Sequence, residues 1–577
     1  MMNERTKTGL EILQAAVLLG VLGDVMLRQT PWGLNVLLFV GALAAAFVML
    51  VLRRRREFWN AQTIALNAAL VFFAACFGWR DAQELKMFNV LAILTILAIL
   101  TLPALKIKTQ IAGVFHYIIG FVWSGISAGF APFFLLFNDI GWKTIPQTGW
   151  SKHLIAVLRG LLIAAPIMFV FGALFMAADA AFQGIVERTF NIQPDQVVAH
   201  IFFIAFFSWI TAGYLRGSLI QSFSNDVSDV TQTLFEPKTE IKPRILSVTE
   251  IRDEEAPKQV SSVTEIRDEE TPKAEEKPKA EEKPKTEEKK SWSWQNLDNT
   301  ALPPVFTLGA IELSIVLGLI NLLFLSFVIV QVPYLFGGFE LVQNTPDFKL
   351  AEYARRGFGE LVLVAALVLP ILLGSHWLLR KDAAVNEKIY RVLACIQIAL
   401  LFVIMVSAAQ RLFILTGNLG YGLTSTRFYP FVIMIWLAVV FLWFSATVLR
   451  GARERFAWGA LWSAIFLLGA LHFFNPDEYI LRTNLRLMKE GREFDAHYNA
   501  DQSDDAIPVL LKNFHELSPD DQKTARYFLS KRFCKKQDEK DFRSWNWSRW
   551  NAARAFQEER SIAESIVTCE DYKVRGH

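Results

Sequence analysis

The chain has 577 residues, of which 53% are hydrophobic and 13% aromatic, a balance typical of membrane proteins rather than soluble ones. Its formal net charge of +3 is divided over both signs, which excludes the strongly basic field that nucleic-acid binding requires. The four cysteines are far apart and form no Cys-x-x-Cys pair, so neither a thiol-redox motif nor a zinc ribbon is indicated.

Twelve apolar segments are long enough to cross a bilayer as helices. The first follows a short basic N-terminus and lacks a small-residue cleavage site, so we expect it to be retained as a membrane helix. The predicted spans are residues 10–27, 33–52, 61–78, 87–105, 112–137, 154–177, 197–219, 306–332, 357–379, 390–413, 428–449 and 456–474.

Residues 222–300 separate seven spans from five and differ in composition. The segment from Ser247 to Glu255 recurs from Ser262 to Glu270, and a Glu/Lys/Pro hexapeptide follows twice in tandem. Such low-complexity sequence buries too little apolar surface to offset chain entropy, so we predict a disordered linker that tethers the two halves. The repeat is compatible with a partner-binding motif or with a spacer, and we favour the spacer.

Residues 475–577 are soluble in character. Asn475-Pro476-Asp477-Glu478 and Ser518-Pro519-Asp520-Asp521 are typical helix starts, with a capping residue, proline at the first position and acids in the first turn. The second start leads into a helix with Ala525, Phe528 and Leu529 on one face. We therefore predict a small α-helical domain. An aromatic run, residues 545–550, is compatible with docking, core filling or anchoring at the membrane surface.

Basic residues favour a cytoplasmic N-terminus, because in the first seven spans nine fall at predicted inner ends and six at outer ends. Seven crossings then place the linker outside, and twelve return the C-terminal domain to the inside. The second set of spans disagrees with this count. Its basic residues Arg380, Lys381, Lys388, Arg391, Arg450, Arg453 and Arg455 would all fall outside.

The most specific local pattern is a Gly-Gly turn after one span and a charged entry into the next. Glu352, Arg356 and Glu360 are spaced by four, so a helix would stack them as acid, base and acid. Arg355 and Arg356 could bind an anionic headgroup or substrate, or the ladder could simply anchor the helix end, which we favour. The predicted interfacial motif comprises Tyr334, Gly337, Gly338, Glu352, Tyr353, Arg355, Arg356, Glu360 and Arg411.

No sequence motif indicates catalysis. There is no HExxH, no GxSxG and no phosphate-binding loop, so we expect no catalytic residue, no metal site and no cofactor.

Several of these stretches resemble a bacterial integral membrane family known as domain of unknown function 4173. They include Tyr334 to Gly338, Glu352 to Phe358, Asn475-Pro476-Asp477 and Ser503-Asp504-Asp505-Ala506, and the resemblance covers roughly residues 150–515 without the linker. The chain departs from the pattern at Gly359 and in its long linker. The resemblance implies location in the bacterial cell membrane and no assigned activity.

We therefore predict an all-α protein: transmembrane helices in residues 1–221 and 301–474, a linker at 222–300 and a helical domain at 475–577. Our first hypothesis is a non-enzymatic regulator, sensor component or assembly factor in the bacterial inner membrane. Its partners would be the lipid bilayer and a protein bound through the C-terminal domain, not nucleic acid. The alternatives are a transporter or lipid flippase for an anionic substrate and, more weakly, a membrane enzyme of lipid or envelope metabolism.

Overall fold

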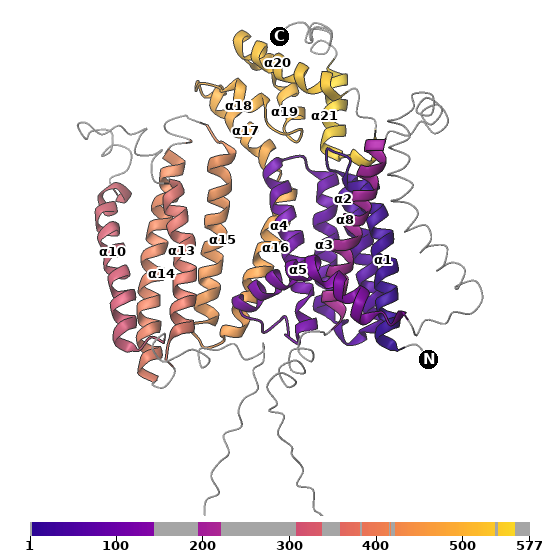
Figure 1. The fold of residues 1–577 in the computed structure, drawn as a ribbon. Helices are drawn as coiled ribbons and strands as arrows, with labels where there is room; N and C mark the ends of the chain where they lie inside the picture. Colours follow the sequence, from indigo (N-terminus) through magenta and orange to yellow (C-terminus); the bar gives the residue numbers. More distant parts are fainter. Residues whose placement is uncertain are drawn as a thin grey trace, which may run out of the picture. The chain divides into compact units, whose positions relative to one another are not determined.

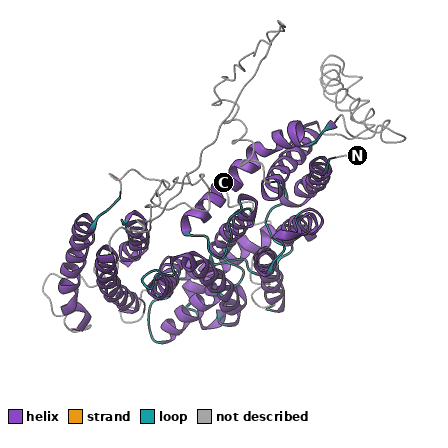
Figure 2. Cartoon of the chain, turned by 90° about the horizontal axis from the view of Figure 1, so that it is seen from below, coloured by secondary structure: helices purple, strands orange, loops and turns teal. Residues whose placement is uncertain are grey.

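The structure is a computed structural model that describes residues 3–142, 194–220, 307–336, 358–380, 384–414, 416, 422–536 and 541–559. Apart from one isolated bridge between Leu308 and Leu379, the regular structure of these residues is helical (Figures 1 and 2). The predicted all-α fold is therefore confirmed. By its internal contacts the chain divides into one unit of residues 1–221 with 297–577, and a second unit of residues 222–296.

The first set of helices packs around large aliphatic and aromatic side chains. Phe73, Phe77, Leu66 and Leu70 are almost completely buried at its centre. Asn60 starts one helix by accepting hydrogen bonds from the two backbone amides that follow in its first turn. The set comprises α1 (Glu4–Leu27), α2 (Leu34–Arg54), α3 (Ala61–Trp79), α4 (Gln83–Leu100), α5 (Val114–Phe134) and α8 (Pro194–Leu219), with short turns η1 (Arg56–Phe58), η2 (Leu102–Leu105) and η3 (Leu135–Asp139).

The second set has its own core, with Leu401, Val440, Phe441 and Phe444 completely buried. One buried polar group of this core is paired with backbone: the Tyr390 hydroxyl donates to the carbonyl of Leu372 at 2.8 Å. The set comprises α10 (Ala310–Phe336), α13 (Phe358–Leu378), α14 (Ala384–Phe413), α15 (Ser425–Thr447), the turn η9 (Arg453–Arg455) and α16 (Phe456–Phe474).

Eleven segments of the described residues are long and apolar enough to cross a membrane. They correspond to eleven of the twelve predicted spans, and the remaining one, residues 154–177, lies outside the described residues. Large apolar side chains face outward on these helices: Leu18 is 72% exposed and Phe466 is 71% exposed. Such exposure would be costly in water and is the natural lipid-facing surface of a multi-pass membrane protein.

The C-terminal domain continues directly from α16. Both predicted helix starts are confirmed, at Pro476 and at Pro519, and Ala525, Phe528 and Leu529 are buried on one face as expected. Completely buried Ile507 and Phe514 complete the domain core. Its elements are α17 (Pro476–Lys489), α18 (Ala496–Ala500), α19 (Ile507–Lys512), η10 (Phe514–Glu516), α20 (Pro519–Lys536), η11 (Phe542–Ser544) and α21 (Trp547–Glu558).

The C-terminal domain lies on one end of the bundle, which we call the domain end (Figure 1). At this end α1 and α3 finish, α2 and α4 begin, α15 begins and α16 finishes. We call the opposite end, where α1 begins, the N end. There Arg54 of α2 contacts Glu4 and Glu11, and Arg55 donates to the carbonyl of Leu219 at 2.9 Å.

The segment of α5 and η3 begins and finishes at the N end. Tyr117, near its start, donates to the carbonyl of Thr109 in the loop that follows α4. Asp139, at its finish, accepts from Arg5 of α1 at 2.7 Å. Its ring contact farthest from the N end joins Phe133 to Trp209 of α8. Trp209 precedes Leu219, the last residue of α8, by ten positions, which corresponds to about 15 Å from the N end.

Residues 112–137 have the length and composition of a span, and in the structure both ends of this segment lie at the N end. Pro132 inside α5 and the π-helical turn η3 bend the chain back toward the N end. Twelve alternating crossings predict the C-terminal domain on the side of the N-terminus. The start of α1 and the domain lie at opposite ends of the bundle (Figure 1).

Candidate functional site

The predicted interfacial motif is described only in part. Tyr334 lies in α10 and Glu360 in α13, while Gly337, Gly338, Glu352, Tyr353, Arg355 and Arg356 lie outside the described residues. Arg411 lies near the end of α14 and is 8% exposed. The structure does not test the ligand-binding or anchoring role of this motif, which stays a prediction.

A buried carboxylate joins the C-terminal domain to the bundle. Asp505, whose side chain is completely buried, accepts hydrogen bonds from the backbone amides of Asp81 and Ala82 at 2.7 and 2.9 Å. These amides directly precede α4, so the negative charge also lies at the favourable end of the helix dipole. The hydroxyls of Ser503 and Ser548 donate to the same carboxylate. One side chain therefore fixes the α3–α4 turn to two parts of the domain.

Arg80 extends this junction to α16. Its guanidinium donates from Nη1 to Asp505 at 3.3 Å and from Nε to the carbonyl of His472 at 2.7 Å. It also lies over the ring of Trp79, 4.8 Å from the centroid. His472 in turn contacts Asn89 of α4, with 2.8 Å between Nε2 and Oδ1. The two helix sets and the domain thus meet around one ion pair, Arg80 with Asp505.

A second buried carboxylate lies beside the first. Asp477, in the first turn of α17, accepts from Ser503, and its Oδ1 has no hydrogen-bond partner within the described part of the chain. Burial raises the pKa of the Asp477 carboxyl to about 7, and the negative charges of Asp505 and Glu84 act in the same direction. Asp477 is thus an ionisable group that changes charge near neutral pH at the junction.

The domain also holds the loop that precedes α15. Asn484 of α17 accepts from the amide of Leu423 at 2.7 Å and donates to the carbonyl of the same residue at 2.9 Å. Gly422 has φ +72°, and a Cβ there would lie 2.8 Å from Oδ1 of Asn484, so only glycine fits this turn. Tyr498 accepts from the amide of Ser425 at 2.7 Å. These contacts fix the start of α15 to the domain.

The chain following α20 forms a third contact, with the α1–α2 turn and the end of α3. Its buried polar side chains bind backbone: Asn546 donates to the carbonyls of Phe77 and Arg80, and Ser548 to that of Trp79. The carbonyl of Trp545 accepts from the amide of Leu34, the first residue of α2. We call Asp477, Ser503, Asp505, Arg80, Asn546 and Ser548 the polar junction.

A family model, Domain of unknown function (DUF4153), matches residues 67–241 and 272–513, which is more than half of the chain. The chain belongs to this family. The resemblance to domain of unknown function 4173 is thereby corrected, because the matching family is DUF4153, although both descriptions leave the function open. No curated protein and no solved structure matches the chain.

The matched residues of this DUF4153 protein include most of the polar junction. Arg80, Asp477, Ser503 and Asp505 all lie inside the match, whereas Ser548 lies beyond it. The resemblance had drawn attention to Asn475-Pro476-Asp477 and to Ser503-Asp504-Asp505, which are separated by 26 positions in the sequence. The structure brings them together through the bond from Ser503 to Asp477.

A further ion pair, at the N end, was not singled out from the sequence. Arg216 of α8 donates from Nε to Asp139 at 2.5 Å, and both side chains are almost completely buried. Arg5 contacts the other oxygen of the same carboxylate. The available signal was the pair of opposite charges near the ends of two apolar segments. It fixes the return of η3 against α1 and α8, a structural rather than a chemical role.

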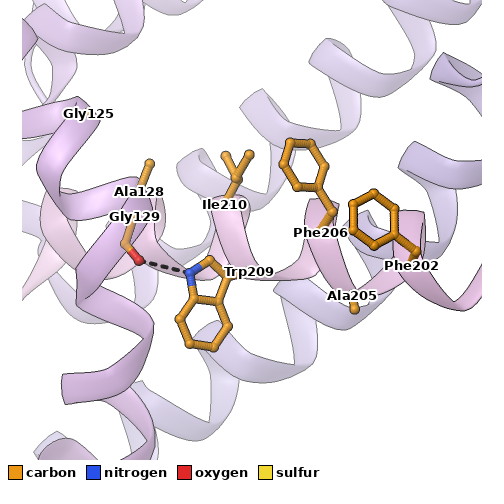
Figure 3. Close-up of a pocket in the computed structure, with 8 residues that line it drawn as sticks. All are labelled: Gly125, Ala128, Gly129, Phe202, Ala205, Phe206, Trp209 and Ile210. Carbon is orange, nitrogen blue, oxygen red and sulfur yellow. Dashed lines mark hydrogen bonds between the residues drawn. The ribbon is translucent and has the colours of Figure 1, made fainter.

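A groove of about 580 Å³ lies between α5 and α8 (Figure 3). Its lining includes Gly125, Gly129, Phe202, Phe206 and Trp209, and the Trp209 indole donates to the carbonyl of Gly129 at 2.8 Å. No titratable side chain lines it. Among the residues that the structure describes, no group of three His, Cys, Asp or Glu side chains is placed to hold a metal ion.

Proposed function

We propose that this protein is a non-enzymatic regulator, sensor component or assembly factor of the bacterial inner membrane, in which the C-terminal domain reports the state of the helix bundle to a protein partner. The N-terminus lies in the cytoplasm and the C-terminal domain on the opposite face of the membrane. The proposal builds on the polar junction and on the distribution of basic residues between the two ends.

The observation that carries the proposal is the environment of Asp505. Its carboxylate contacts the α3–α4 turn, the arginine bound to the end of α16, and the segment that opens α21. A relative shift of these helices therefore changes the bonds that hold the domain. Packed interfaces of this kind have discrete arrangements rather than continuous ones, which allows a small shift in the bundle to alter the domain.

The distribution of basic residues between the two ends of the bundle supports the proposed orientation. The basic residues of the second set, among them Arg391, Arg453 and Arg455, lie at the same end as the Arg53–Arg56 cluster of the first set. Arg28, Arg80 and Lys86 lie at the domain end. Since short cytoplasmic loops carry the excess of lysine and arginine, the N end is assigned to the cytoplasm.

Reporter fusions test the orientation. Alkaline phosphatase, active only outside the cytoplasm, should be active when fused after residue 577 and inactive after residue 260, and green fluorescent protein should give the reverse. Equal behaviour at the two positions would refute the orientation. It would leave the coupling proposal open to its own test.

Site-specific photo-crosslinking in cells tests the coupling. A photoreactive residue in place of Tyr527, which is exposed on the domain, should trap a defined partner in the otherwise wild-type protein. Asp505→Asn should reduce this product, while Asp495→Asn should not, because asparagine caps α18 as aspartate does. Absence of a specific product, or a product unaffected by Asp505→Asn, would overturn the coupling role.

A further inference from the structure

The segment from η11 into α21 has two chemically different sides. Ser544, Asn546 and Ser548 are buried against the bundle, while the alternating Trp545 and Trp547 are 44% and 46% exposed. Trp550, one turn further on, is 43% exposed, and its ring lies 5.1 Å from that of Trp547. The polar side chains fix the segment, and the three indoles are exposed. We call Trp545, Trp547, Trp550 and the 64% exposed Phe542 the aromatic face.

The place of this segment on the bundle is set by backbone contacts to the α1–α2 turn. Arg543 donates to the carbonyl of Val25 near the end of α1, and Arg549 donates to that of Trp32, each at 2.5 Å. Val25 and Val21, one turn earlier, are 42% and 45% exposed and belong to the lipid-facing surface of α1. The segment that carries the aromatic face therefore lies against the end of α1, a helix whose outward side belongs to the lipid-facing surface.

The described arginines of this segment each pair with a carboxylate, and Asp81 is shared with Lys86. Arg543 pairs with Asp541 at 2.5 Å, Arg549 with Asp81 at 3.0 Å and Arg554 with Glu558 at 3.3 Å. A surface that recruits anionic headgroups would present unpaired cations. An aromatic surface with paired charges instead matches the headgroup and glycerol zone, where indole rings gain from an apolar body and a polar N–H.

We propose that the aromatic face binds the headgroup and glycerol layer of the same bilayer, whatever the charge of its lipids. The C-terminal domain is then held to the membrane by two independent contacts, the polar junction to the bundle and the aromatic face to lipid.

Fluorescence quenching in vesicles tests this inference. The full-length chain, with Cys76, Cys395, Cys534 and Cys569 replaced by alanine, receives one cysteine at Trp547 or Trp550 and a bimane label. It is reconstituted in phosphatidylcholine that contains lipid with a nitroxide near the top of the acyl chain. The matched control is Tyr527→Cys on α20, which replaces a 52% exposed aromatic residue away from this segment.

We expect about twofold quenching by the nitroxide lipid at Trp547 and Trp550, little at Tyr527, and the same result after phosphatidylglycerol is added. Strong quenching by aqueous iodide without quenching by lipid would overturn the inference, because the face would then lie in water. Protection from both quenchers would also overturn it, since protein would cover the face. If replacing Trp547 or Trp550 lowers the melting temperature of the protein, the label is placed at Phe542→Cys instead.

Discussion

Replacement of Asp505 by asparagine tests the polar junction most directly. The carboxylate receives two backbone amides, two hydroxyls and the Arg80 guanidinium, and its side chain is completely buried. Asparagine has nearly the same size as aspartate but carries no charge. Its NH2 group would face groups that now donate hydrogen bonds to the carboxylate. Arg80 then keeps the carbonyl of His472 and the Trp79 ring but loses its anionic partner.

Loss of one partner from a buried ion pair costs about 3–5 kcal/mol. Arg80 is 13% exposed at its side chain and Asp505 is inaccessible, so solvent compensates little of this cost. The docked state of the domain should weaken by roughly two to four orders of magnitude in equilibrium constant. That change is large enough to populate an undocked domain while the two helix sets keep their own cores.

Limited trypsin digestion of the full-length protein in detergent measures this opening, because cleavage of a transiently opened state follows its population. Asp505→Asn should be cut in the C-terminal domain much faster than the wild type. Asp495→Asn, in the same domain and at the first turn of α18, should be cut at the wild-type rate. Equal digestion of the two variants would refute the assignment of Asp505 as the main tie between bundle and domain.

Three further outcomes follow from the same contacts. The pKa of Asp477 is raised to about 7, so between pH 4 and 7 the folded protein keeps a proton on this carboxyl that the unfolded chain has lost. The free energy of unfolding should therefore fall by on the order of 4 kcal/mol as the pH rises from 4 to 7. Thermal melting in detergent should show this dependence, and Asp477→Asn should remove it. Asp139→Asn should lower the yield of monodisperse protein at a cost of about 3–5 kcal/mol, and pairing it with Arg216→Met should recover part of the loss. Gly33→Ala places a Cβ 2.4 Å from the carbonyl oxygen of Trp545 and should lower the melting temperature, unlike Gly41→Ala, where nothing lies within 4 Å.

Features that depend on local sequence were predictable. Runs of about 20 apolar residues form spanning helices wherever they lie, and the Pro476 and Pro519 helix starts need only their own side chains and backbone. The buried face of α20 followed from its helical spacing. Asp24 and Arg28 are four positions apart at the end of α1, and the structure places their charged groups 4.0 Å apart, with His200 as a closer partner from another helix.

Features that depend on distant partners were not predictable from one sequence. Asp505 and Arg80 are separated by 425 positions, and nothing in the composition around either residue indicates the other. The predicted interfacial motif drew on charges spaced by four, an ionic pattern that a single helix can reveal. The return of α5 was missed for a related reason, because a segment that crosses the bilayer and one that turns back midway both bury the same apolar residues.

The acidic pattern of the C-terminal domain shows how a local explanation can be correct and still incomplete. An aspartate after a proline at a helix start is explained by capping, and a cap can remain exposed to water. Asp477 and Asp505 are instead 4% and 6% exposed, and a charge is buried at this cost only where it has partners. Asp505 finds partners in the membrane bundle, Arg80 and the backbone amides of Asp81 and Ala82, whereas Asp477 accepts from Ser503 of its own domain. The buried junction therefore stabilises the docked domain. A change that separates the domain from the bundle breaks the pair of Arg80 with Asp505 and exposes Arg80, Asp477 and Asp505 to water.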